Sequence, residues 1–174
     1  MQQADAARTI VIVRHAKAET HAATDHARPL TERGLADARA AGHWLGQRLD
    51  AAAGESLVAL VSTATRARLT WEQIAAVVPG RTRMLDGLYE AGPDEVLQTL
   101  AMLDEAVRVA IVVGHNPTVH EVVETLSDGS TAAHQELRSR GFPTCAVGVL
   151  ALSGTWRDLR PGACSLTDVH VARG

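Results

Sequence analysis

The chain has 174 residues, 46% hydrophobic and 21% charged, which is long and apolar enough to fold as a single domain spanning residues 1–174. Seventeen basic and 20 acidic residues give a formal net charge of −3, and the aromatic side chains are three Trp, one Tyr and one Phe. This composition excludes a disordered chain and argues against nucleic acid as a partner.

The two cysteines, Cys145 and Cys164, lie far apart and in no metal-binding spacing, so we expect reduced thiols in a cytoplasmic protein. The first eight residues lack the basic stretch of a signal peptide. The apolar run after them is too short for a signal peptide or a membrane span. We therefore expect a soluble, intracellular protein with no membrane partner.

An apolar, β-branched run over residues 10–13 predicts a buried central strand. Arg14 and His15 follow it directly, so we expect them at the carboxyl end of that strand. In open α/β sheets ligands bind at this edge, and a cation beside an imidazole suits an anionic group such as phosphate. Residues 16–30 are polar, include Arg28, and are expected to form a loop over the strand end.

Thr31 is a candidate N-cap for an amphipathic helix that would extend to about Asp50. A second short buried strand is expected over residues 57–61. The hydroxyl residues within 62–65 would cap the next helix, and Arg66 would fall in its first turn, directed toward the same sheet edge as the first arginine. A cation there opposes the helix dipole, which suggests that something other than helix stability placed it.

Residues 81–85 are expected to form a third strand, and residues 87–92 a loop that carries Tyr89 and Glu90. A helix should begin within residues 92–95, because a proline at the first helical position is followed there by two acids.

The strongest strand signal covers residues 109–113. It leads directly into His115, after which Asn116 is expected to cap a helix that Pro117 begins. A second histidine is thus expected between a strand end and a helix N-terminus, in a place equivalent to that of His15.

Residues 127–143 are expected to be a polar surface excursion, and residues 144–152 and 155–159 a closing β-hairpin. Strands that alternate with helices at this spacing predict an α/β three-layer sandwich with a largely parallel central sheet flanked by helices.

Three strand ends therefore bring together Arg14 with His15, Arg66, and His115. Two guanidiniums, an imidazole and a helix N-terminus can neutralise the oxygens of a phosphoryl group during its transfer. His15 can then act as nucleophile and form a phosphohistidine that water later hydrolyses.

Four stretches of the sequence carry a family resemblance, and they occur in the family's order: Arg14–Glu19, Arg28–Gly34, Ser62–Ala67 and Val113–Pro117. They resemble the histidine phosphatase superfamily, and within it the short SixA-type phosphohistidine phosphatases. The resemblance implies a phosphoglycerate mutase-like fold with His15 as the phosphoacceptor. It further implies a phosphate pocket made of three residues and bordered by two more substrate-binding residues: Arg14, Arg66 and His115 in the pocket, and Arg28 and Asn116 beside it.

One departure from the family concerns the general acid, which no motif fixes. In related mutases a Glu from the loop before the next helix protonates the leaving group, so Glu90 is the nearest candidate and Asp94 the second. Each carboxylate also has an ordinary surface interpretation, and Arg28 has an alternative role as a salt-bridge partner of Asp25 or Glu32. The other departure is Thr63, which stands where the family usually has Pro.

The sequence gives no sign of a metal or a cofactor. Residues His120 to Glu124 differ from the HExxH zinc motif by a carboxylate in place of the second histidine, and no nucleotide-binding glycine motif is present. We therefore expect a metal-independent phosphatase of phosphohistidine proteins. Two alternatives are a phosphomonoesterase or mutase acting on small metabolites, and a phospho-binding module without turnover.

Overall fold

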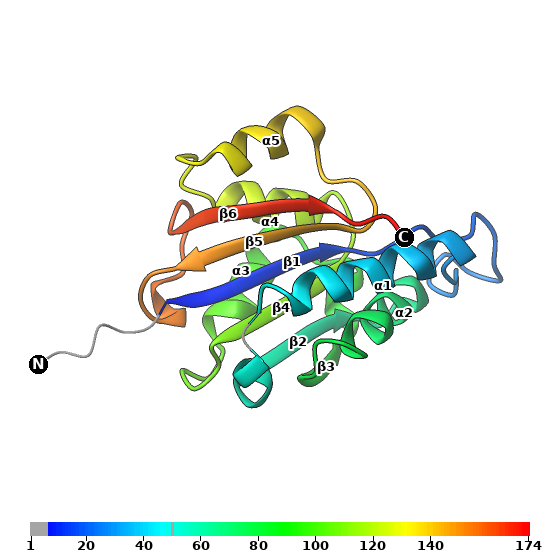
Figure 1. Ribbon diagram of the computed structural model, residues 1–174, viewed down its shortest axis with the longest axis horizontal. Coiled ribbons are helices and arrows are strands. Elements are labelled where there is room, and N and C mark those ends of the chain that lie inside the picture. The colour runs from blue at the N-terminus through cyan, green and yellow to red at the C-terminus, as the bar shows by residue number, and fades with distance from the viewer. Residues whose placement is uncertain (1–6, 50) are drawn as a thin grey trace, which may run out of the picture.

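The computed structural model describes residues 7–49 and 51–174. The strands are β1 (Arg8–Arg14), β2 (Leu57–Ser62), β3 (Arg81–Leu85), β4 (Val109–Gly114), β5 (Ala146–Leu152) and β6 (Cys164–Val171). Within the described residues they form one six-stranded sheet in the order β3-β2-β4-β1-β5-β6 (Figure 1). The first four strands run parallel to one another, whereas β5 runs antiparallel to both β1 and β6.

Helices cover both faces of the sheet. They are α1 (Glu32–Gly46), α2 (Thr65–Ala75), α3 (Pro93–Ala101), α4 (Thr118–Leu126) and α5 (Ala132–Arg140), with short 3₁₀ helices η1 (Ala51–Ser56), η2 (Asp86–Tyr89) and η3 (Trp156–Asp158). In Figure 1, α1 and α2 lie on one face, α3 and α4 lie on the other, and α5 lies beside β6. The predicted three-layer α/β sandwich is confirmed. No helix in the described part of the chain has the length and apolar character that crossing a membrane requires.

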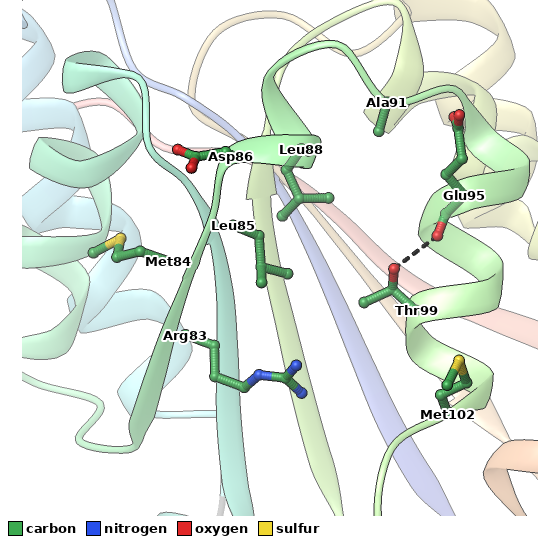
Figure 2. Close-up of a pocket in the computed structure, with 10 residues that line it drawn as sticks. Arg83, Met84, Leu85, Asp86, Leu88, Ala91, Glu95, Thr99 and Met102 are labelled. Atoms are coloured by element: carbon green, nitrogen blue, oxygen red, sulfur yellow. Dashed lines mark hydrogen bonds between the residues drawn. The ribbon is translucent and has the colours of Figure 1, made fainter.

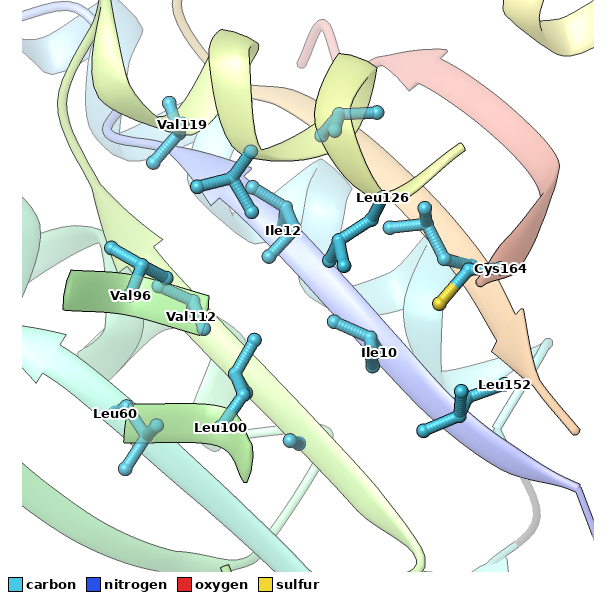
Figure 3. Close-up of a cluster of buried hydrophobic side chains, with 14 of the residues drawn as sticks. Ile10, Ile12, Leu60, Val96, Leu100, Val112, Val119, Leu126, Leu152 and Cys164 are labelled. Atoms are coloured by element: carbon cyan, nitrogen blue, oxygen red, sulfur yellow. The ribbon is translucent and has the colours of Figure 1, made fainter. Parts of the chain in front are cut away.

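Alternating side chains of β1 point into two separate cores. Ile10 and Ile12 pack with α3 and α4, as Figure 3 shows, whereas Val11 and Val13 pack with α1 and α2 on the opposite face. A strand buried on both faces needs apolar residues at every position, which is why its sequence is a continuous apolar run.

The parallel register of β1 and β4 places the two histidines side by side. Arg14 is paired with Gly114, so the next residue on each strand, His15 and His115, leaves the sheet at the same edge. The backbone N–H of His15 donates to the Gly114 carbonyl at 3.0 Å. Ser62 ends β2 at the same level, because the residues before it pair in register with β4.

The expectation of a second hairpin strand over residues 155–159 is wrong. Residues 155–159 contain η3 instead, where Trp156 is fully buried and its indole N–H donates to the Val107 carbonyl at 2.9 Å. Asp158 accepts from the backbone N–H of Thr155 and so caps this turn. The strand that follows β5 in the chain and pairs with it is β6. The burial of β6 does not alternate with a clear period of two, so its pattern gave no strand signal.

The end of the first helix also differs from expectation, whereas its start does not. Thr31 does cap α1, since its side chain accepts from the Gly34 N–H at 2.9 Å. The helix ends at Gly46 rather than near Asp50, which itself lies outside the described residues; glycine is a poor residue for continuing a helix.

The expected polar excursion over residues 127–143 contains α5. Thr131 caps this helix by accepting from the N–H of His134. Leu137 is the one side chain of α5 that is buried, so the sequence shows no apolar stripe there.

Candidate active site

His15 lies at the centre of the cluster formed at the strand ends, and only 8% of it is exposed. Its Nδ1 is 2.8 Å from the carbonyl oxygen of Ala16, and because a carbonyl can only accept, Nδ1 carries the ring proton. Its Nε2 accepts from Nε of Arg66 at 3.3 Å. The two contacts therefore hold His15 as one neutral tautomer, with the lone pair on Nε2.

The environment keeps both histidines neutral. The pKa of His15 is lowered to about 3. Burial is the largest cause, the hydrogen bond to the Ala16 carbonyl opposes it, and the nearby His115 and two arginines act in the same direction as burial. Burial, followed by the charge of Arg66, lowers the pKa of His115 to about 4. At pH 7 the imidazole of His15 is thus in its nucleophilic form.

Arg66 is fixed by three contacts in the first turn of α2, and 5% of it is exposed. Besides its bond to His15, the guanidinium donates to the backbone carbonyl of Asp25 at 2.8 Å and pairs with the Asp25 carboxylate at 3.2 Å. The predicted direction of this side chain, toward the edge that carries His15, is confirmed.

The hydroxyl of Thr70 connects the two main elements of the site. It is fully buried, donates to the Arg66 carbonyl at 2.7 Å and accepts from the backbone N–H of Ala16 at 3.0 Å. One side chain therefore links the helix of Arg66 to the segment that follows His15.

His115 is bonded to Ser62 and faces His15. Its Nε2 lies 2.8 Å from Oγ of Ser62, and its ring centroid is 5.2 Å from that of His15. The expectation that hydroxyl residues in 62–65 cap α2 is wrong: the helix has no side-chain cap, and the Ser62 oxygen contacts His115 and the Ala64 N–H instead.

Arg14 and Asn116 share a backbone acceptor. The carbonyl of Phe142 accepts from Arg14 at 3.1 Å and from the Asn116 amide at 2.8 Å. The expected capping role of Asn116 is wrong, because its side chain is committed to this carbonyl. The helix begins at Thr118, and Pro117 precedes it without a side-chain cap.

Three buried polar atoms of this cluster have no hydrogen-bond partner among the described residues: Nε of Arg14, Nδ1 of His115 and Oδ1 of Asn116. Buried polar atoms in folded proteins are normally paired. An arginine N–H can only donate, so the atom on Arg14 suits an anionic acceptor. This is the chemistry expected of a phosphoryl group.

Asp25 and Tyr89 are members of the site that the sequence reasoning missed. The Asp25 carboxylate accepts from the Tyr89 hydroxyl at 2.6 Å, from Arg28 at 2.8 Å and from Arg66. The Tyr89 hydrogen bond, followed by those arginines, holds the pKa of Asp25 well below its usual range. The Tyr89 ring also packs edge-on against His115, with 5.6 Å between the centroids. The sequence held one signal that could have found them: Tyr89 is the single tyrosine of the chain and stands next to Glu90, the first candidate for the general acid.

Arg28 lies at the border of the cluster. It forms the salt bridge to Asp25 that was weighed as its alternative role, and it donates to the Glu19 carbonyl at 2.9 Å. Through Asp25 it is connected to Arg66 without touching His15 by any hydrogen bond found in the described residues.

Neither candidate acid joins this network. Glu90 follows η2 and is exposed, and Asp94 is exposed in the first turn of α3. In the part of the chain that the structure describes, neither carboxylate makes a side-chain hydrogen bond or an ion pair. The same described residues contain no group of three or more His, Cys, Asp or Glu side chains that could hold a metal ion.

Known proteins are similar to this chain in sequence and in fold. Residues 10–105 match the model of the histidine phosphatase superfamily (branch 1). An uncharacterized protein of Mycobacterium tuberculosis strain H37Rv is 38% identical, over 92% of this chain and 100% of the relative. The phosphohistidine phosphatase SixA of Escherichia coli K12 is 32% identical, over 70% of this chain and 76% of its own length.

A solved structure assigned to a SixA phosphohistidine phosphatase of Nakamurella multipartitia is 35% identical to the chain. It superposes with a TM-score of 0.84 over 95% of this chain and 96% of its own. The family match spans more than half of the chain, and the matched region contains Arg14, His15 and Arg66. The chain belongs to the histidine phosphatase superfamily.

Proposed function

We propose that the protein is a phosphohistidine phosphatase that works by double displacement on His15. The observation that carries the proposal is the protonation of that ring. The Ala16 carbonyl holds the proton on Nδ1, so Nε2 is unprotonated and its electron pair accepts from Arg66. The similarity to SixA of Escherichia coli supports a phosphohistidine as the substrate.

In the first step, Nε2 of His15 attacks phosphorus. A new N–P bond forms while the P–N bond of the substrate breaks, and its electron pair stays on the departing imidazole. In this proposal the charges of Arg14 and Arg66 neutralise the phosphoryl oxygens, and the uncharged His115 donates a hydrogen bond to one of them. Because the Ser62 oxygen accepts from the Ala64 N–H, its own proton is available for Nε2 of His115, which leaves Nδ1 as a donor.

In the second step, water attacks the phosphorus on His15 and orthophosphate leaves. The N–P bond breaks and its electron pair returns to Nε2. Because Nδ1 keeps its proton throughout, the phosphorylated ring is cationic and departs as a neutral imidazole, which is a good leaving group.

The absence of a general acid from the network favours P–N bonds over alkyl esters. An alkoxide needs a proton as it leaves, whereas an imidazole protonated on its second nitrogen leaves as a neutral base. Within the described residues, neither Glu90 nor Asp94 contacts a pocket side chain through a hydrogen bond or ion pair. Oδ1 of Asn116 is a buried acceptor without a partner among the described residues. Because an amide oxygen can only accept, it suits an N–H of the substrate and not a phosphoryl oxygen, which is itself an acceptor.

We further propose a cytoplasmic location. Cys145 and Cys164 are both buried free thiols, as expected in a reducing compartment. Cell fractionation with antibody detection tests this, and recovery in an extracytoplasmic fraction would overturn it.

The test of the function is turnover of a peptide phosphorylated on histidine with phosphoramidate, followed by ³¹P NMR of orthophosphate release. Turnover that persists in EDTA, together with an alkali-stable phosphoryl adduct mapped to His15, supports the proposal. The His15→Ala variant should form no adduct. An adduct on another residue, or turnover of phosphomonoesters with none of phosphohistidine, would overturn it.

A further inference from the structure

A groove that the proposed catalytic steps do not use lies between β3 and α3. Its volume is about 550 Å³, within the range of sites that hold a ligand or a peptide side chain. Figure 2 shows Arg83 on the strand side, with Thr99 and Met102 on the helix side. Three apolar side chains, Leu85, Leu88 and Ala91, line it between these two sides.

The strand beside the groove is the edge of the sheet. Residues 81–84 are all exposed, and among the described strands β3 pairs only with β2. Its outer backbone N–H and C=O groups are therefore open to an added strand, which is a common way for a protein to bind an extended peptide.

Charge and apolar surface occur together here. Arg81 and Arg83 pair in register with Val58 and Leu60 of β2, which belong to the core under α3, so both arginines are on the groove side of the sheet. Neither makes an ion pair or side-chain hydrogen bond with a described residue. Met102 is 86% exposed, and a flexible thioether suits an interface that adapts to its partner.

The acidic side chains in the groove do not cancel this charge. Glu95 is engaged at the start of α3, where it accepts from the backbone N–H of Gly92. Asp86 is the first residue of η2, across the groove from Glu95 and at the end away from Arg83, as Figure 2 shows. One unpaired cation, Arg83, thus lines the groove beside apolar surface, and a second, Arg81, lies on the same side of the sheet. This surface is complementary to a segment that carries both a carboxylate and an apolar side chain.

The groove and the proposed active site are adjacent along the chain, because η2 contributes a residue to each. Leu88 lines the groove, and the next residue, Tyr89, bonds to Asp25 and packs against His115. Consecutive Cα atoms are only about 3.8 Å apart, so a chain lying in the groove ends beside the mouth of the site.

We propose that this groove docks the segment of the substrate protein that flanks its phosphohistidine. The segment lies extended along β3, with an apolar side chain on Leu85 and Leu88 and a carboxylate on Arg83. The inference rests on the proposed function, because it names the kind of substrate that the same site receives.

The test uses two peptides with one phosphohistidine each, prepared with phosphoramidate. One carries Leu and Asp on both sides of the histidine, and the other carries Ser and Lys at the same positions. We expect a KM at least about fivefold lower for the Leu/Asp peptide, the size of one lost interface anchor. Arg83→Glu should reverse the order of the two KM values, and Met102→Ser should weaken the preference for Leu.

Two controls separate docking from catalysis. Free phosphohistidine has no flanks, so its kcat/KM should be the same in the wild type, Arg83→Glu and Met102→Ser. Arg138→Glu makes the same charge change on exposed α5, beside the opposite edge of the sheet, and should leave both peptides unaffected.

The outcomes distinguish the two proposals. Equal KM values for the two peptides, or an equal loss on free phosphohistidine in Arg83→Glu, would overturn the docking groove while leaving the phosphatase intact. A wild-type protein that hydrolyses none of the three substrates would overturn the proposed function and this inference with it.

Discussion

Nε of Arg66 donates to Nε2 of His15 at 3.3 Å, so the guanidinium lies on the one ring nitrogen that carries no proton. A phosphoryl group that reaches this nitrogen arrives within range of the cation. A single contact between the end of β1 and the first turn of α2 thereby brings together the proposed nucleophile and the cation proposed to neutralise the phosphoryl charge.

Arg66→Ala should lower kcat by about 10²-fold to 10³-fold, the usual cost of one preorganised donor to a developing charge. Arg66→Lys keeps the charge but loses the planar geometry, so it should restore only part of the rate. Release of orthophosphate from free phosphohistidine measures both. Arg68→Ala is the matched control, because Arg68 lies on the same helix in an exposed pair with Glu72. Wild-type rates in Arg66→Ala would contradict the assignment.

The ring protons of His15 and His115 should titrate far below the ordinary range of histidine. Burial lowers the pKa of His15 to about 3 and that of His115 to about 4. Two-dimensional NMR of the C–H resonances between pH 5.5 and 8 should show both rings neutral throughout, with His15→Gln and His115→Gln used for assignment. Titration of either ring near pH 6.5 would contradict this.

The same shifts predict how stability depends on pH. Unfolded histidines bind protons below about pH 6.5, whereas these two folded rings stay neutral until much lower pH, so the unfolded state binds more protons in between. Their contribution is complete above pH 6.5 and is lost as the pH falls toward 4 and 3. Urea unfolding at pH 7 and pH 5 should show a smaller loss of stability in His115→Gln than in the wild type. An equal loss would contradict it.

The sequence predicted the parts of the fold that depend on burial. The runs at 10–13 and 109–113 are apolar at every position because both faces of their strands are covered, so their pattern is unambiguous. The strand β6 and the helix α5 are less buried, and the burial of each lacks the regular period that sequence patterns detect. The end of the expected hairpin was wrong because Trp156 is held by a distant carbonyl, that of Val107.

The residues at strand ends could be predicted for the same reason, because parallel strands deliver Arg14, His15 and His115 to one edge. The contacts that orient these side chains could not be predicted from the sequence. Several are made by backbone carbonyls, such as those of Ala16 and Phe142, whose position depends on the chain path rather than on residue type.

Thr70 should be a positioning residue for both halves of the site. Thr70→Val removes the acceptor of the buried Ala16 N–H, which costs about 1–3 kcal/mol of stability when such a group is left unpaired. It should also lower kcat, since Ala16 holds the His15 tautomer. Thr70→Ser keeps both hydrogen bonds and should restore the rate. Urea unfolding and phosphohistidine turnover measure the two effects, and a Ser variant as slow as the Val variant would contradict the assignment.

Asp25 and Tyr89 should act as a unit on Arg66. Asp25→Asn weakens the ion pair that orients the guanidinium, and Tyr89→Phe removes the hydroxyl that donates to the same carboxylate while keeping the ring against His115. The two changes should therefore be non-additive in kcat/KM, with the double variant close to Asp25→Asn alone. Strictly additive effects would show that Tyr89 acts independently of the carboxylate.

The last prediction concerns Glu90 and the leaving group. The side chain is exposed, and within the described residues it makes no hydrogen bond or ion pair, so Glu90→Gln should leave the hydrolysis of phosphohistidine within about twofold of wild type, far below the 10²-fold to 10⁴-fold of a general acid. Alkyl phosphates should be poor substrates of the wild type, because their alkoxide lacks a placed proton donor. Esters of acidic phenols, which leave without a proton, should be hydrolysed faster than alkyl esters. Asp94→Asn serves as the matched carboxylate control. A loss of 10²-fold or more on alkyl phosphates in Glu90→Gln would instead identify Glu90 as the acid and favour a small-metabolite phosphatase, with His15 still the nucleophile.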